Sequence, residues 1–329
     1  MKMNDYINDF TNHLKDAIKI AYGTKLKKSK KAIKNVLICG LGGSGIGGTI
    51  VSDLISKKIS IPVITNKDYT IPSFVNKHTL VIVSSYSGNT EETLSALEKC
   101  QAKESEIAII TSGGRLNDIG EKNGYNRLIV PKGHPPRAMF AYAFAKLFYM
   151  LHHYKIIDGY FEEELENSIN LLEEKKSTIQ KQALSLAKKL YGKTPVIYTP
   201  NGFEGVGVRF RQQINENSKM LCWHHVIPEM NHNELLGWRV NTSDLAVVCL
   251  RNKSDYQRTQ VRMNITKKVI SKFTKNISEI WSEGDTLIEN SLYHINLGDW
   301  VSWYLSEMNQ VDAIEIDVIN FLKKELSKL

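Results

Sequence analysis

Cysteine is scarce in this sequence. The chain of 329 residues has four cysteines, Cys39, Cys100, Cys222 and Cys249, and no two of them form a CxxC pair. Cys39 and Cys249 lie inside apolar runs that we expect to be buried strands. This pattern excludes a disulfide scaffold and favours reduced thiols in a cytosolic protein.

Long hydrophobic runs are also absent. The most apolar stretch, residues 138–151, is interrupted by Lys146 and is too short to cross the roughly 30 Å apolar layer of a bilayer as a helix. Residues 1–10 contain acids and amides where an export signal would have its apolar segment. We therefore expect a cytoplasmic protein that does not enter a membrane, with residues 138–151 forming a buried helix.

Charge of one sign is only mildly in excess. Lys and Arg number 43 and Asp and Glu number 35, which gives a net charge of +8. That excess suits phosphate esters, nucleic acid or an anionic membrane and does not choose between them. No helix-turn-helix or concentrated basic face is visible, so we expect no nucleic-acid partner. The length and the 42% hydrophobic content are typical of a globular protein of two domains.

Short apolar runs alternate with segments of helical period through the first half. The expected strands are residues 35–39, 61–65, 79–84, 106–111 and 127–130, and the expected helices include 3–22, 49–56 and 91–102. Continuous Val/Ile strands separated by helices are typical of a parallel sheet that is covered on both faces. The sequence therefore predicts a doubly wound α/β domain, followed by a long helical region at residues 154–189.

The strand and glycine pattern recurs in the second half. Residues 195–207 can be laid on residues 35–47 at an offset of 160, and residues 244–250 on 79–85 at an offset of 165. We predict two doubly wound parallel-sheet domains of flavodoxin-like type, residues 1–153 and 154–329, related by internal duplication. The copies differ at one telling position, because Glu204 replaces Ser44. A carboxylate repels a phosphate, so we expect only the first domain to bind one.

Residues 40–45 match the dinucleotide fingerprint GxGxxG. An NAD site also expects an acid at the end of the second strand, where this chain has Thr65 and Asn66. No cofactor is therefore predicted. A tight turn that needs only backbone freedom remains an alternative to a phosphate-binding loop.

Residues 85–93 read Ser-Tyr-Ser-Gly-Asn-Thr-Glu-Glu-Thr and form the sharper signal. Three hydroxyl groups precede a helix start at the carboxyl end of a middle strand, which is where α/β sheets bind ligands. A plain hydroxyl-capped turn is the alternative, and we favour a phosphate site.

A dense group of possible metal ligands lies between residues 224 and 234. Its spacing matches neither HExxH nor a common four-ligand pattern, so we predict no metal. Zinc binding and structural histidines both stay open as interpretations of this group, which comprises His224, His225, Glu229, His232 and Glu234.

Residues 42–45 together with residues 85–93 resemble the sugar isomerase (SIS) domain. Residues 215–219 (Asn-Glu-Asn-Ser-Lys), residues 228–234 (Pro-Glu-Met-Asn-His-Asn-Glu) and the pair Leu322-Lys323 narrow the resemblance to the bifunctional phosphoglucose/phosphomannose isomerase family. The resemblance covers nearly the whole chain. It implies a metal-independent homodimeric enzyme of glycolysis and gluconeogenesis that interconverts glucose 6-phosphate and mannose 6-phosphate with fructose 6-phosphate through a cis-enediol.

The resemblance also implies roles for particular residues. Glu216 is the base that moves a proton between C2 and C1, and Arg137 stabilises the enediolate. His232, contributed by the partner subunit, opens the sugar ring with help from Lys323, although Lys324 is the alternative for that position. The substrate phosphate is bound by Gly43, Ser44, Ser85, Ser87 and Thr90.

Without the resemblance the same catalytic residues have ordinary interpretations. Glu216 and Lys219 have the spacing of a surface ion pair on a helix expected at residues 208–221. Arg137 is a helix cap or surface cation, and Lys323 is a solvated lysine of an amphipathic C-terminal helix.

One segment departs from the family pattern. Many relatives have Thr and Pro before the last helix, whereas residues 311–316 have neither, which weakens the expectation of mannose phosphate activity. An isomerase for another sugar phosphate and a non-catalytic sugar-phosphate-binding regulator remain as alternatives. A glutamine-dependent amidotransferase would need a glutaminase domain with a reactive N-terminal cysteine, and residue 2 is Lys.

Overall fold

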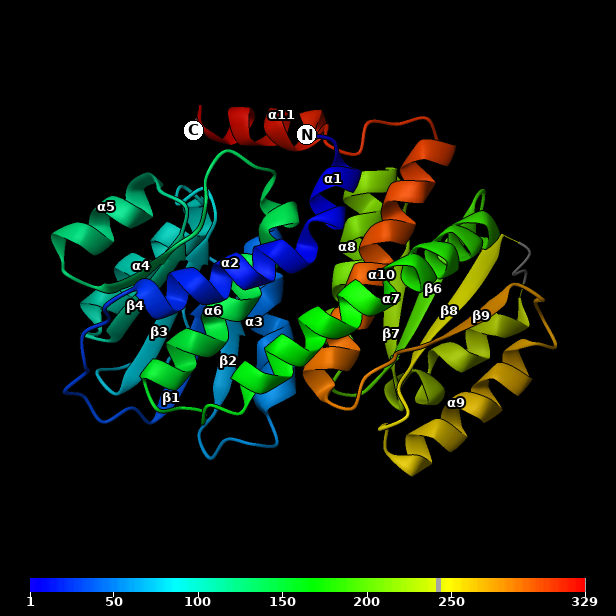
Figure 1. Ribbon diagram of the computed structural model, residues 1–329, viewed down its shortest axis with the longest axis horizontal. Helices are drawn as coiled ribbons and strands as arrows, with labels where there is room; N and C mark the ends of the chain where they lie inside the picture. The colour runs from blue at the N-terminus through cyan, green and yellow to red at the C-terminus, as the bar shows by residue number, and fades with distance from the viewer. Residues whose placement is uncertain (241–243, 329) are drawn as a thin grey trace.

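Two parallel β-sheets stand side by side with helices between and around them (Figure 1). The computed structural model describes residues 1–240 and 244–328. The first sheet has the strand order β2-β1-β3-β4-β5 and contains β1 (Asn35–Cys39), β2 (Val63–Asn66), β3 (Thr79–Ser85), β4 (Glu106–Thr111) and β5 (Asn126–Ile129). The second has the order β7-β6-β8-β9 and contains β6 (Thr194–Pro200), β7 (Trp223–Ile227), β8 (Leu245–Arg251) and β9 (Ile277–Trp281).

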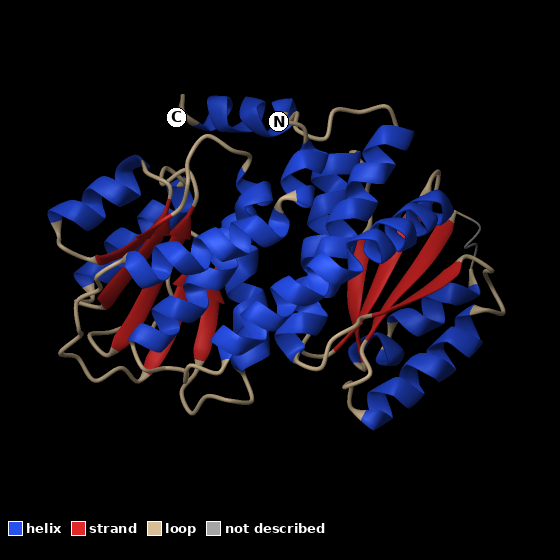
Figure 2. Cartoon of the chain, viewed as in Figure 1, coloured by secondary structure: helices blue, strands red, loops and turns tan. Residues whose placement is uncertain are grey.

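The helices cover both faces of each sheet, as Figure 2 shows. Those of the first half are α1 (Met3–Asn8), α2 (Phe10–Gly23), α3 (Gly42–Ile55), α4 (Glu91–Ala102), α5 (Gly114–Lys122) and α6 (Phe140–His153), with a 3-10 turn η1 (Pro136–Met139). Those of the second half are α7 (Phe161–Leu190), α8 (Glu204–Ser218), α9 (Gln257–Ile270), α10 (Leu287–Met308) and α11 (Asp317–Leu326), with η2 (Glu229–His232) and η3 (Glu234–Arg239). No helix within the described ranges is both long and apolar enough to cross a membrane.

The two halves share one strand order. In each, the first strand pairs with the second on one side and with the third on the other, and all the pairings are parallel. Helix α3 follows β1 just as α8 follows β6. The doubly wound fold is therefore confirmed, and the shared order is consistent with the predicted duplication.

A single apolar cluster joins the two halves. Alternate strand residues face opposite sides, so Val36 and Ile38 of β1 point into this cluster while Leu37 points to the outer helices. The same cluster includes Ile197 of β6 and Val248 of β8, together with buried residues of α3, α6, α7, α8 and α10. The inner faces of both sheets therefore share one core.

Several expected elements are confirmed to the residue, and others differ. The strand at residues 35–39, the helix at 91–102 and the strand at 106–111 are found with the expected bounds. The expected glycine loop at residues 40–48 is instead the start of a helix, because α3 begins at Gly42. Its first turn lies tight against the preceding strand: a Cβ on Gly45 would stand 2.2 Å from the carbonyl oxygen of Gly40. Glycine here allows a close approach of the helix, not a long loop.

Candidate active site

The serine-rich segment at the end of β3, residues 85–90, forms a turn that is held by hydrogen bonds among its own residues. The hydroxyls of Ser85 and Thr90 lie 2.9 Å apart, and the amide of Gly88 donates to Ser85 Oγ at 3.2 Å. Ser87 Oγ accepts from the amide of Asn89 at 3.2 Å. Gly88 has a φ of +67°, and a Cβ there would stand 1.8 Å from a backbone oxygen, so only glycine fits. The result is a rigid cluster of hydroxyls at the N-terminus of α4.

Ser44 ties the start of α3 to this turn. Its Oγ accepts from the amide of Tyr86 at 2.9 Å, and Ser84 Oγ donates to the Ser44 carbonyl at 3.3 Å. The chain passes from β1 outward to β2 and then returns to β3 on the other side of β1, so this contact bridges the topological switch point of the sheet. Open α/β sheets bind ligands at that point, and two helix N-termini meet there.

Arg137 lies directly beside the start of α3. A Cβ on Gly43 would stand 3.0 Å from Arg137 Cα, so the absence of a side chain at Gly43 lets the two segments touch. The Arg137 side chain is 3% exposed. It is therefore a buried cation, and not the surface cation that its position in the sequence suggests.

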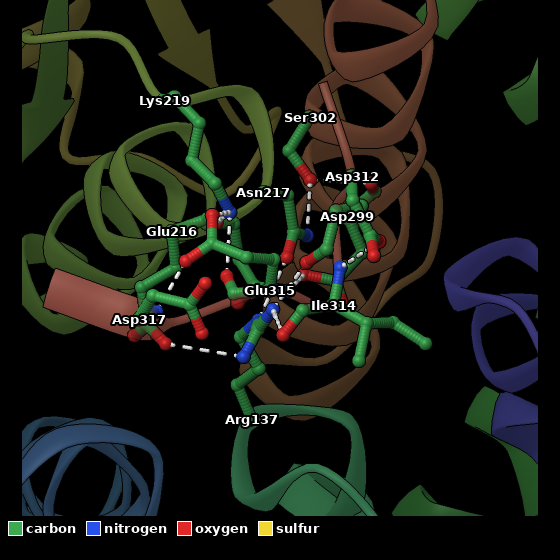
Figure 3. A network of polar contacts seen from close by, with 12 residues as sticks. Arg137, Glu216, Asn217, Lys219, Asp299, Ser302, Asp312, Ile314, Glu315 and Asp317 are labelled. Carbon is green, nitrogen blue, oxygen red and sulfur yellow. Dashed lines mark hydrogen bonds and ion pairs between the residues drawn. The ribbon is translucent and has the colours of Figure 1, made fainter. Parts of the chain in front are cut away.

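The Arg137 guanidinium reaches into the second half of the chain (Figure 3). Its Nη1 lies 3.4 Å from Glu216 Oε2, and its Nε donates to Asn217 Oδ1 at 2.7 Å. Its Nη2 donates to the carbonyls of Ala313 and Ile314. Burial lowers the pKa of Arg137, and the Glu216 carboxylate opposes that shift. The guanidinium remains charged, because arginine does not lose its proton in proteins.

Glu216 occupies the last turn of α8, and its side chain is 27% exposed. The expected surface pair between its carboxylate and Lys219 is not what forms. Lys219 Nζ donates to the backbone carbonyl of Glu216 at 2.7 Å, while the carboxylate faces Arg137. A partly open carboxylate beside a buried cation can both accept and return a proton.

A network of buried hydrogen bonds holds Arg137 beside Glu216. Asp299 of α10 accepts from Arg209 Nη2 at 2.6 Å and from Gln213 Nε2 at 3.0 Å. Asn217, which holds Arg137, donates to Ser302 Oγ at 2.9 Å. Sequence reasoning did not assign these supporting residues, because Asp299 is one of several polar residues in α10 and nothing in its local sequence distinguishes it. Their hydrogen bonds fix Arg137 in one position relative to α8 and α10.

His232 does not lie beside Glu216 in the same chain. Helix α8 begins at the carboxyl edge of the second sheet and ends with Glu216 near its amino edge, and β7 then returns to the carboxyl edge. At about 1.5 Å per residue, the 15 residues of α8 separate the two edges by roughly 22 Å. His232 follows β7 in η2, and its side chain is exposed.

Lys323 and Lys324 both lie on α11, where no residue is buried. Figure 1 shows α11 (red) across one edge of the molecule, the edge at which α10 ends. Lys323 is exposed, and within the described residues it forms no side-chain hydrogen bond or ion pair with Glu216 or Arg137.

Two histidines of the group between residues 224 and 234, His224 and His225, lie beside carboxylates. His225 Nδ1 lies 2.8 Å from Glu234, which also accepts from the hydroxyl of Tyr198. His224 Nε2 lies 3.8 Å from Glu204, and burial lowers the pKa of His224. Among residues 1–240 and 244–328, no three His, Cys, Asp or Glu side chains gather as a metal site would require.

Comparison with known proteins places this geometry in a family. Residues 179–326 match the model of the bacterial phospho-glucose isomerase C-terminal SIS domain. A bifunctional phosphoglucose/phosphomannose isomerase of Caldicellulosiruptor bescii is 36% identical over 99% of both chains. The chain belongs to the bifunctional phosphoglucose/phosphomannose isomerase family.

Other members and structures agree with that assignment. The relative of the same name from Aquifex aeolicus is 33% identical over 92% of this chain and 93% of its own. Among solved structures, a phosphosugar isomerase of Clostridium difficile superposes with a TM-score of 0.79, 16% identity and coverage of 96% of this chain and 95% of its own. At that identity the structural likeness supports the SIS fold alone.

Proposed function

We propose that this protein is an aldose–ketose isomerase that interconverts glucose 6-phosphate with fructose 6-phosphate. The contact of Arg137 with both Gly43 and Glu216 carries the proposal, because it joins an anion-binding helix start to a carboxylate across the two halves. The names of the relatives support the substrates, and they support mannose 6-phosphate as a second aldose.

The phosphate is bound in the first half. Ser44, Ser85, Ser87 and Thr90 direct hydroxyl groups and backbone amides toward the start of α3 and α4, and the helix N-termini add partial positive charge. Gly43 keeps this site in contact with Arg137. The sugar then extends from the phosphate toward α8.

Proton transfer takes place at Glu216. Its carboxylate removes the proton from C2 of the open-chain aldose and returns it to C1, which yields the ketose through a cis-enediol. During the transfer, negative charge develops on the substrate oxygen and Arg137 stabilises it. The buried network around Asn217 and Asp299 holds that cation in place beforehand, so little reorganisation is needed.

Ring opening requires a further acid–base group, and within the described part of one chain neither His232 nor Lys323 contacts Glu216 or Arg137. We propose a homodimer in which His232 of the partner subunit reaches the site and passes a proton between the ring oxygen and the anomeric hydroxyl, with Lys323 assisting. Two observations support the dimer. His232 is exposed and far from Glu216 of its own chain, and α11 presents uncovered apolar residues, with Phe321 64% and Leu322 58% exposed.

We propose a cytoplasmic location. All four cysteines are free, and three of them are buried, which suits a reducing compartment.

The test is formation of fructose 6-phosphate by purified protein treated with EDTA, from glucose 6-phosphate and separately from mannose 6-phosphate. Activity on both, lost in Glu216→Gln, supports the bifunctional enzyme without a metal. Activity on glucose 6-phosphate alone assigns the narrower function and points to residues 311–316. No activity, with sugar phosphate still raising Tm, overturns the isomerase and favours a binding regulator.

A further inference from the structure

The segment between α10 and α11, residues 309–316, is called the strap here. It is fastened to the active site from two sides (Figure 3). Arg137 Nη2 binds two of its carbonyls, those of Ala313 and Ile314. From the other side, Lys219 Nζ donates to the carbonyl of Glu315 at 2.7 Å and lies 3.7 Å from the Glu315 carboxylate.

Lys219 is an unusual residue for its position. It ends α8 in the left-handed conformation, with a φ of 56° and a ψ of 35°, where glycine is the common residue. A lysine there strains the backbone. Its ammonium group donates to the carbonyls of Glu216 and Glu315 and forms an ion pair with the Glu315 carboxylate.

Glu315 connects Lys219 to the first residue of α11. While one of its carboxylate oxygens faces Lys219, the other accepts from the amide of Asp317, the first residue of α11. This hydrogen bond caps a helix whose N-cap residue, Ile316, provides no side-chain cap. Since no residue of α11 is buried, the strap is what sets the position of that helix within its own chain.

We propose that Lys219 is a positioning residue that, through Glu315 and the strap, places Lys323 over the bound sugar. This inference rests on the proposed function, in which Lys323 assists ring opening. Lys219 touches no reacting atom. It joins the end of α8, where Glu216 lies, to the start of α11, where Lys323 lies, so that both groups keep a fixed separation.

The test compares kcat and KM for fructose 6-phosphate formation in the whole protein and in Lys219→Met, Lys219→Arg, Lys323→Met and the double variant Lys219→Met/Lys323→Met. Lys219→Met is expected to lower kcat roughly ten- to a hundredfold through misplacement of Lys323, with little change in KM. Lys219→Arg is expected to recover part of the loss. The double variant is expected to be no slower than Lys323→Met alone.

A matched control comes from Lys267, which pairs with Glu279 far from the strap, so Lys267→Met is expected to retain the kcat of the unaltered protein. Glu315→Gln tests the same link without altering α8, and a smaller loss of kcat is expected. Hydrogen exchange of residues 317–326 is expected to be faster in Lys219→Met than in Lys267→Met.

Two failures can be told apart. An unaltered protein without isomerase activity overturns the proposed function. An active unaltered protein, combined with unchanged exchange in Lys219→Met or with losses that multiply in the double variant, overturns the positioning role of Lys219 while the isomerase stands.

Discussion

Helices α3 and α8 follow equivalent strands in the two halves, yet their N-termini have opposite surroundings. The first turn of α3 carries Ser44, whose hydroxyl accepts from the amide of Tyr86. The start of α8 carries Glu204, and the amide of Gly205 donates to Asp53 Oδ2 of α3 at 3.2 Å. A helix N-terminus attracts an anion in either case. We expect the start of α3 to bind the phosphate of the substrate. At the start of α8, the carboxylates of Glu204 and Asp53 are the anions beside the helix N-terminus.

The two helices also touch each other there. A Cβ on Gly205 would stand 3.1 Å from the backbone of Ile50, so Gly205 allows α8 to pack closely against α3. In the proposed function, proton transfer takes place at the other end of α8, where Glu216 lies. If the proposed roles hold, the same fold serves two purposes in this chain, with anion binding at the start of α3 and proton transfer at the end of α8.

The largest expected effect comes from removing the proton acceptor. Glu216→Gln keeps the size of the side chain and loses the base, so kcat is expected to fall about a thousandfold while sugar phosphate still raises Tm. The matched control is Glu204→Gln at the other end of the same helix, which is expected to keep kcat. Comparable kcat for Glu216→Gln and the unaltered enzyme would remove Glu216 as the base.

Asp53, whose carboxylate accepts from the Gly205 amide at the start of α8, makes the free energy of unfolding depend on pH. Burial raises the pKa of Asp53 from 3.8 to about 6. A raised acid pKa means that the folded state binds more protons than the unfolded state, so the free energy of unfolding falls as pH rises from about 4 to 6 and then levels off. A difference of about two pKa units corresponds to about 3 kcal/mol.

Asp53→Asn keeps an oxygen for the Gly205 amide and cannot ionise. The variant is therefore expected to be more stable than the unaltered protein at pH 8 and to match it near pH 4, as measured by urea unfolding. Asp118→Asn, at an exposed position of α5, is the control. Parallel pH curves for Asp53→Asn and the unaltered protein would show that this carboxyl does not carry the effect.

A smaller effect is expected at the phosphate end. Ser87→Ala removes one ground-state contact, so KM is expected to rise about tenfold with kcat nearly unchanged. Ser95→Ala on α4 provides the matched control, because it removes a hydroxyl that donates to the Tyr69 carbonyl and accepts from Lys99 Nζ. If both variants keep the original KM, Ser87 is not part of the phosphate site.

The smallest effect is expected from Glu204→Ser, which makes the second half resemble the first at this position. Because Asp53 still occupies the Gly205 amide, one inorganic phosphate per chain is expected by calorimetry, as for the unaltered protein. Two phosphates bound per chain would show that Glu204 alone excludes the anion.

The sheets could be predicted from the sequence because their strands are continuous apolar runs. The strand at residues 223–227 could not, since His224 and His225 have the composition of a ligand group and are only partly buried, and Trp223 is exposed. The glycine segment of α3 was wrongly expected to be a loop, because helix propensity alone disfavours glycine, whereas close contact with β1 and Arg137 requires it.

The site was harder to foresee from residues alone. Arg137 and Glu216 are 79 positions apart in numbering, and nothing local to either one indicates their contact. Their roles came from family resemblance, and the structure adds the contact between them. Arg137 binds the carbonyl of Ala313, and Lys219 binds the carbonyl of Glu315. These contacts join residues that are far apart in the sequence, so no short motif indicates them.

The single apolar cluster that covers the inner faces of both sheets has a consequence for how this molecule denatures. Each half seals the other's hydrophobic face with α7 and α10 between them, so separating the halves would expose that face to water. We therefore expect neither half to be stable alone and expect heat to unfold both in one cooperative transition. A repeated architecture would then unfold as a single unit, so that a destabilising substitution in one half also lowers the stability of the other.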